Sequence, residues 1–215
     1  MRYLYFIIFF IIGSTFVCAQ QGGNSFDIKR ILSSRQAIIL NQAKQGLQTP
    51  SGVIIEYGDI DYYGTGIPQE EQEIGSSGWL DEQGEVVVVG INFNVIESMT
   101  EGYNEAMSMI LQLILLHEYG HIEDRFQPDP SAPGYAYWHA FLERDDAAAL
   151  CSVISGILGG GSGVANSAEI AKKLCLFYQM MARSYSKVKE SYPTIPDWNP
   201  CNPCGIFGIS TSIPV

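Results

Sequence analysis

Positive charge and histidine are scarce in this sequence. Its 215 residues include 12 Lys and Arg against 23 Asp and Glu, and the formal net charge is -11. No run of Lys or Arg offsets this balance locally, so the basic surface of a nucleic-acid-binding protein is missing. Anionic membranes are an equally poor partner for so acidic a chain. The composition therefore excludes the classes of protein that bind polyanions.

Charged residues make up only 16% of the chain, whereas hydrophobic residues make up 47%. This balance is that of a folded soluble protein, and it excludes a disordered or fibrous one. The length suits one domain with a substantial core. We therefore expect residues 20–215 to form a single domain that ends in a Cys- and Pro-rich tail at residues 193–215.

Residues 1–19 have the pattern of a secretory signal peptide. Arg2 supplies an early positive charge, an apolar stretch follows, and Val17 and Ala19 occupy positions -3 and -1 of a cleavage site. The apolar stretch is too short to span a membrane comfortably, so no stable anchor is expected after cleavage. Loss of Arg2 and of no acid would change the charge from -11 to -12. A lipoprotein anchored through Cys18 is disfavoured, because Val17 stands where a small residue is required.

Cleavage after Ala19 would leave four cysteines in a secreted or periplasmic protein, where disulfides are allowed. Four cysteines permit three pairings, and the sequence does not choose between them. The simplest arrangement joins two predicted helices through Cys151 and Cys175 and closes a small tail loop through Cys201 and Cys204. A redox role for the tail pair is disfavoured, because it does not begin a helix after a strand.

The first half of the domain mixes a helix with extended segments. Hydrophobic periodicity predicts a helix at residues 26–46 and a short strand at residues 51–58. Turn-rich, acidic residues predict a loop at 59–77. A hairpin is predicted at residues 78–96, with its turn at residues 82–84 and a β-branched run in its second strand.

The second half of the domain is predicted to be helical. The first helix spans about residues 101–124, and a segment at 125–134 with three closely spaced prolines ends it. Further helices are predicted at residues 135–158 and 167–191, separated by a Gly-rich connector without lysine. That connector is not a phosphate-binding loop, because it lacks the required spacing.

Two of the three histidines lie four residues apart on the first of these helices. On an α-helix this spacing places His117 and His121 on the same face, about 6 Å apart along the axis, where they can reach one metal ion. Glu118 lies beside His117, where its carboxylate can take a proton from a water molecule. The alternative interpretation is a core helix whose outer face happens to carry two histidines.

His117-Glu118-Tyr119-Gly120-His121, after an apolar helix and preceded by the strand sequence VVVVGINFN, resembles the zincin metallopeptidases. The resemblance covers about residues 85–150. It implies an α+β fold with a small, mostly antiparallel sheet, an edge strand over the active-site helix, and packed backing helices. It also implies one catalytic Zn²⁺ and an extended protein or peptide substrate that pairs with the edge strand.

The resemblance also implies a third zinc ligand. The metzincin pattern would require Gly at 124 and His at 127, and this chain has Asp124 and Gln127 instead. The gluzincin pattern places a glutamate on the next helix, and Glu143 is the residue that matches. Asp146 and Asp145 are the alternative ligands.

The residues around Glu143 depart from the gluzincin pattern. Ala147 stands four residues after Glu143, where the family carries an acid. Asp146 still lies on the Glu143 face of the helix and could accept a hydrogen bond from the second nitrogen of a ligand histidine. Asp145 points elsewhere. Asp146 is therefore also a candidate supporting residue.

The mechanism that the resemblance implies uses Glu118 as the general base. It removes a proton from the attacking water and delivers it to the leaving amine. A donor is also needed for the developing oxyanion. His139, Tyr135 and Tyr137 are the candidates, because they lie near the start of the second helix, although such residues more commonly serve in packing or capping.

The function predicted from the sequence is a secreted, zinc-dependent metalloendopeptidase-like hydrolase. One alternative is a catalytically silent protein of zincin fold that binds zinc or a partner. Another is a disulfide-stabilised interaction module, which would leave the motif of His117, Glu118 and His121 unexplained. The sequence indicates neither the substrate nor the oligomeric state.

Overall fold

The fold combines one mixed sheet with helices and is α+β, as expected. The computed structural model describes residues 7–9, 27–69, 72–79, 85–123, 135–159 and 166–213. Its strands are β1 (Ile7–Phe9), β2 (Asp27–Lys29), β3 (Ile54–Asp61), β4 (Gly75–Trp79) and β5 (Val86–Ile91). Its helices are α1 (Ser34–Ala43), α2 (Phe93–Thr100), α3 (Asn104–Ile122), α4 (Tyr135–Leu158), α5 (Ser167–Ser191) and the 3₁₀ helix η2 (Asn202–Phe207).

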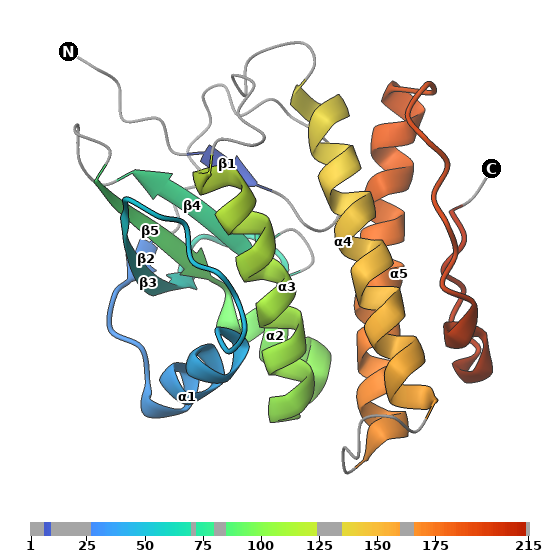
Figure 1. Cartoon of the computed structure of the whole chain (residues 1–215), viewed down its shortest axis with the longest axis horizontal. Coiled ribbons are helices and arrows are strands. Elements are labelled where there is room, and N and C mark those ends of the chain that lie inside the picture. Colours follow the sequence, from blue (N-terminus) through green and yellow to red (C-terminus); the bar gives the residue numbers. More distant parts are fainter. Residues whose placement is uncertain are drawn as a thin grey trace.

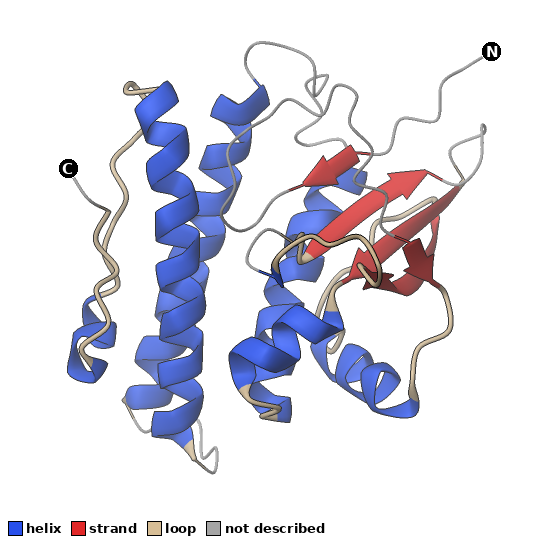
Figure 2. Ribbon diagram, turned by 180° about the vertical axis from the view of Figure 1, so that it is seen from behind, coloured by secondary structure: helices blue, strands red, loops and turns tan. Residues whose placement is uncertain are grey.

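The layers follow one another across the molecule. The sheet lies on one side, α3 lies in the middle, and α4, α5 and the C-terminal tail follow on the other side (Figure 1). The view from behind shows the same succession, with the tail outermost (Figure 2). A helix that is covered on two sides needs apolar residues around most of its surface. The buried residues of α3 accordingly include Ala106, Met107, Ile110, Leu111, Leu113, Ile114, Leu115 and Tyr119.

The sheet has the strand order β1-β4-β5-β3-β2. The β1–β4, β4–β5 and β3–β2 pairs are antiparallel, and only β3 and β5 run parallel. The predicted hairpin is therefore present as β4 and β5, with Ser77 opposite Val89. Its predicted turn, residues 82–84, lies outside the described residues. Most of the pairings are antiparallel, as expected, but β5, which contains the VVVV sequence, is not the expected edge strand, because it lies between β4 and β3.

The prediction of a helix at residues 26–46 is wrong at the beginning of that range. α1 begins at Ser34, because Ser33 caps it: the Ser33 hydroxyl accepts a hydrogen bond from the Gln36 N–H, and the Gln36 side chain accepts one from the Ser33 N–H. Residues 27–29 form β2 instead, paired with the end of β3. Periodicity alone did not distinguish these two structures.

The prediction of a loop at residues 59–77 is wrong at both ends of that range. Its first residues complete β3, and its last residues begin β4, the strand that crosses α3. A helix was also missed after β5. Asn92 ends the strand and caps α2, because its Oδ1 accepts a hydrogen bond from the Val95 N–H.

The C-terminal tail is held to α4 and α5 by two disulfides. Cys151 of α4 is bonded to Cys201, and Cys175 of α5 is bonded to Cys204. The simplest pairing that we considered from the sequence is therefore wrong. The two tail cysteines are only three residues apart, but they flank the beginning of η2 and so reach two different helices. Trp198 adds an apolar anchor, since it is buried against the rings of α5 tyrosines.

The segment expected to be a signal peptide is described only at residues 7–9, which form β1 and pair with β4. The expected cleavage site after Ala19, and Cys18 beside it, lie outside the described residues. Among the helices that the structure describes, none combines the length and hydrophobicity of a membrane-spanning segment. The two disulfides fit an extracellular protein.

Candidate metal centre

The last turns of α3 place three candidate functional side chains inside the molecule. His117, Glu118 and His121 are all buried, and Glu118 has no exposed surface. The helix can carry these polar groups because its preceding turns are anchored by apolar residues against the sheet. Leu116, which precedes them on the opposite side of the helix turn, is 46% exposed.

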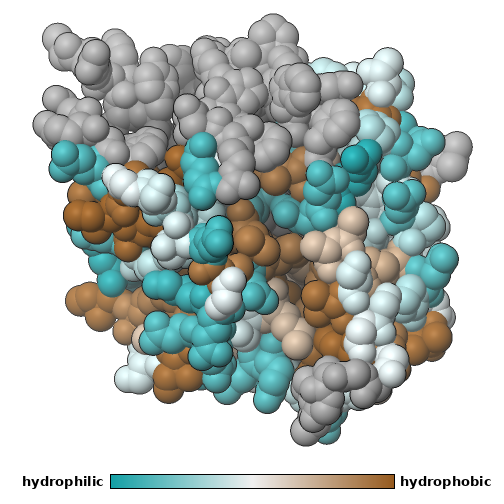
Figure 3. All heavy atoms as spheres, in the orientation of Figure 1, coloured by the Kyte–Doolittle hydropathy of each residue, from teal (hydrophilic) through white to brown (hydrophobic). Residues whose placement is uncertain are grey.

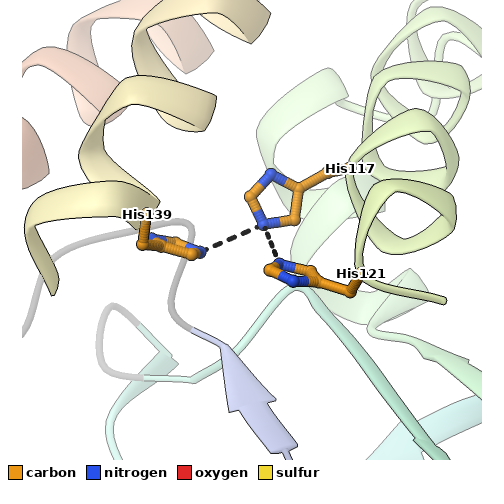
Figure 4. Close-up of side chains that lie close together, drawn as sticks. All are labelled: His117, His121 and His139. Atoms are coloured by element: carbon orange, nitrogen blue, oxygen red, sulfur yellow. Dashed lines mark hydrogen bonds between the residues drawn. The ribbon is translucent and has the colours of Figure 1, made fainter. Parts of the chain in front are cut away.

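The third histidine of the chain completes a cluster with the two on α3. His139, near the beginning of α4, directs its ring toward His117 and His121 across the space between the helices (Figure 4). The Nε2 atom of His117 lies 3.1 Å from Nε2 of His139 and 3.1 Å from Nε2 of His121. The ligand atoms of the three histidines all lie within 4.8 Å of one another, close enough to bind one metal ion.

Two carboxylates of α4 hold the outer nitrogens of these rings. The Oδ2 atom of Asp146 lies 2.8 Å from Nδ1 of His117, and Oε1 of Glu143 lies 3.4 Å from Nδ1 of His139. A carboxylate on Nδ1 keeps the proton there, so the Nε2 lone pair points toward the cluster. Carboxylates in this position orient metal-binding histidines in many proteins.

The pKa values of the residues around the cluster are shifted from their ordinary values. Burial lowers the pKa of His117, but the hydrogen bond and charge of Asp146 outweigh it, and the pKa is raised. Burial and the neighbouring histidines hold the pKa of His139 well below its ordinary value. Burial raises the pKa of Glu143 to about 8, against the attraction of His117. The neutral form of His139 is the form that binds metal ions.

Glu118 lies beneath β4. A Cβ atom at Gly75 would come within 2.8 Å of Oε1 of Glu118 and 2.7 Å of Cγ2 of Ile114, so this strand approaches α3 closely because residue 75 is glycine. Burial raises the pKa of Glu118, and the charge of His117 and an interaction with Ser77 oppose the increase. Within the described part of the chain, neither Glu118 oxygen has a hydrogen-bond partner of good geometry.

Two of the separations between the histidine nitrogens are close to those of a tetrahedral metal site. A zinc ion bound to imidazoles at 2.0–2.1 Å separates two ligand nitrogens by roughly 3.3 Å, close to the two separations of 3.1 Å at His117. Hydrogen bonds alone suit the cluster less well. One Nε2 lone pair cannot accept two good hydrogen bonds, although two other Nε2 atoms face it.

We expected Glu143 to be the third ligand, but the residue that converges with His117 and His121 is His139. Glu143 is buried beside the cluster, but it contacts the far nitrogen of His139 and is not one of the converging ligands. Asp146 has the supporting position that its spacing suggested. Asp145 is exposed and pairs with Arg144, so it lies outside the cluster.

The oxyanion candidates have different outcomes. His139 belongs to the cluster itself, whereas the side chains of Tyr135 and Tyr137 lie outside the described part of the structure. The four-residue spacing of His139 and Glu143 could have identified His139 as a candidate ligand from the sequence. Residues four apart share one helix face, so any fold-back of this helix that brought Glu143 to α3 would bring the histidine with it.

No family model, curated protein or solved structure matches this chain.

Proposed function

We propose that this chain is a secreted, zinc-dependent peptidase with a zincin-like active site. The observation that carries the proposal is the convergence of His117, His121 and His139 beside the buried carboxylate of Glu118. Three protein ligands with one position left for substrate or water are typical of catalytic zinc sites, whereas structural sites use four. The disulfides support the secreted location.

Zinc is the metal that best suits this donor set. Imidazole is a good ligand for zinc, and buried neutral histidines held by carboxylates are the form in which it binds. A zinc ion bound to the cluster would polarise a peptide carbonyl and lower the pKa of a water molecule.

Glu118 is the proposed general base. Its carboxylate takes the proton of the attacking water and then delivers it to the nitrogen of the leaving amine. Two features support this role: burial raises the pKa of Glu118 above its ordinary value, and its oxygens make no good hydrogen bonds within the described residues. A carboxylate tied up by protein donors would be a poorer proton acceptor.

β4 is the proposed substrate strand. It runs past Glu118, and Gly75 allows its backbone to approach the carboxylate closely. Its outer side pairs with β1, residues 7–9 of the segment that we expect to be removed with the signal peptide. Without that segment the outer side of β4 would be a free sheet edge, and an extended peptide could pair with it. Apolar side chains gather around a hollow on the face drawn in Figure 3, between the sheet and the α4–α5 pair.

Replacement of Glu118 tests the proposed activity. We expect zinc-loaded wild-type protein to cleave unfolded proteins, and Glu118→Gln to lower the rate by about 10²–10⁴-fold while one zinc per chain stays bound. Glu105→Gln is the matched control, because Glu105 is an exposed acid in the first turn of the same helix. It should retain both zinc and activity.

Two results would lead away from this function. If the zinc-loaded wild type cleaves no member of a broad panel of unfolded proteins, the chain is a zinc-binding protein without turnover. If the wild type binds no zinc, the histidine cluster has a purely structural role.

A further inference from the structure

Glu73 is a buried carboxyl group that the peptidase mechanism leaves without a role. It is only 5% exposed, and its Oε2 atom has no hydrogen-bond partner among the residues that the structure describes. Its backbone, in contrast, is fully engaged: the N–H donates to the Tyr62 hydroxyl, and the carbonyl accepts from the Asn92 side chain. The fold therefore fixes the backbone of this residue firmly and leaves Oε2 of its side chain without a partner among the described residues.

A buried carboxyl group of this kind lowers the stability of the folded protein. A carboxylate removed from water without a partner destabilises the folded state, and the usual response is protonation. Burial, and after it the charge of Glu118, raise the pKa of Glu73 to about 8. Buried groups that destabilise the folded state and lie beside reactive residues are more common at functional sites than in ordinary protein cores.

The position of Glu73 connects it to the proposed active site. It lies two residues before Gly75, the residue at which β4 approaches the Glu118 carboxylate. Glu73 and Glu118 are close enough to repel each other. Together they place two buried carboxyl groups with raised pKa values at the beginning of the proposed substrate strand, and within the described residues Glu73 forms no ion pair.

We propose that Glu73 is a specificity-determining residue that binds a positively charged amine of the peptide substrate, either its amino terminus or a lysine side chain. This inference rests on the proposed peptidase function and names a substrate class for it. A substrate ammonium group would supply the missing hydrogen-bond donor and the missing positive charge at once. The net charge of -11 also favours the approach of cationic peptides over acidic ones.

Chemical modification of substrates tests the proposal. A library of unstructured peptides is offered to the zinc-loaded wild type in four forms: untreated, acetylated at the amino terminus only, acetylated at lysine only, and dimethylated at all amines. Acetylation removes the charge and dimethylation retains it. We expect one of the two acetylations to lower initial cleavage rates at least tenfold, with a smaller effect of dimethylation. The acetylation that matters identifies the source of the amine.

Binding without turnover provides the second readout. A peptide cleaved by the wild type is titrated calorimetrically into zinc-loaded Glu118→Gln protein, with its amines free or acetylated. We expect acetylation to weaken binding about tenfold or more. The difference should disappear when Glu73→Gln is added, and it should persist when Glu85→Gln is added instead, because Glu85 is an exposed acid of the same sheet region.

The outcomes separate this proposal from the one on which it rests. Equal cleavage of all four libraries, or an acetylation effect that survives Glu73→Gln, overturns the role of Glu73 and leaves the peptidase function standing. Absence of cleavage in every form by zinc-loaded protein overturns both. Glu73→Gln removes a buried charge and keeps the shape of the side chain, so it is expected to fold.

Discussion

At the scale of single residues, the proposed site is a set of pairs in which an imidazole meets a carboxylate. Asp146 holds His117 and Glu143 lies behind His139. Each carboxylate orients its ring and raises the basicity of the nitrogen that faces the cluster. The contribution of such a pair to metal affinity can be separated from that of the ligand itself by replacing only the carboxylate.

Asp146→Asn should weaken zinc binding about 10–100-fold, because it removes the negative charge at Nδ1 of His117 and keeps the volume. Competition against a chromophoric chelator measures this affinity. Asp145→Asn is the matched control, since Asp145 is the exposed neighbour of Asp146 and should bind zinc like the wild type. Equal affinities of the two variants would show that Asp146 does not support a ligand.

Glu73 should also make stability depend on pH. Its pKa in the folded state is about 8, above the ordinary value of 4.5, so the folded state binds its proton more tightly than the unfolded state does. Its contribution to stability is therefore fully present below pH 4.5 and is lost as the pH rises toward 8. Glu73→Gln should not show this loss. Its free energy of unfolding should exceed that of the wild type by a few kcal/mol at pH 8.5 but by much less at pH 4.5.

Urea unfolding of both proteins at several pH values measures the difference. Glu118 and Glu143 also have raised pKa values, so the comparison between the two proteins, and not the pH profile of either one alone, isolates Glu73. A constant difference in the free energy of unfolding across this pH range would argue against a buried, uncompensated Glu73.

At the scale of elements, the close contact between β4 and α3 depends on one glycine. Gly75→Ala would place a Cβ atom 2.8 Å from Oε1 of Glu118 and 2.7 Å from a methyl group of Ile114, so one of them must move. We expect the proposed peptidase activity to fall about tenfold or more, with zinc affinity nearly unchanged, because residue 75 lies against the proposed base and not against a proposed ligand.

Gly156→Ala is the matched control for this substitution. Gly156 lies within α4, where a Cβ atom would meet nothing within 4 Å. Alanine there should raise the free energy of unfolding by up to about 1 kcal/mol, because it favours the helix. If both glycine variants retained full activity, β4 would not constrain Glu118.

The disulfides attach the tail to the helical half of the molecule. Replacement of both Cys151 and Cys201 by alanine should lower the free energy of unfolding by about 2–4 kcal/mol. Chemical denaturation under non-reducing conditions measures the effect. Unchanged stability would mean that the tail packs onto α4 without help from the bridge.

The long helices of the second half were predictable from the sequence, and the short elements were not. The apolar periodicity of α3, α4 and α5 extends over many turns, and Pro- or Gly-rich segments separate them. β2 and β4 are three and five residues long, and β4 consists largely of Gly and Ser. Its strand character comes from pairing with β5 and not from its own residues, so it resembled a loop.

At the scale of the whole molecule, the site depends on how two halves meet. α3 belongs to the half with the sheet, and α4 belongs to the half with α5 and the tail (Figure 1). The motif of His117, Glu118 and His121 is local and could be recognised from spacing alone. The identity of the third ligand depends on which face of α4 turns toward α3, and one helix carries both His139 and Glu143 on that face.

A competitive zinc titration of His139→Ala and Glu143→Gln tests the central claim most directly. With His139 as the third ligand, the zinc affinity of His139→Ala should be at least 100-fold lower than that of the wild type. Glu143→Gln should keep one zinc per chain, and its loss of zinc affinity should be at least ten times smaller than that of His139→Ala. The opposite order, with wild-type affinity in His139→Ala and loss of zinc in Glu143→Gln, would contradict the site described above.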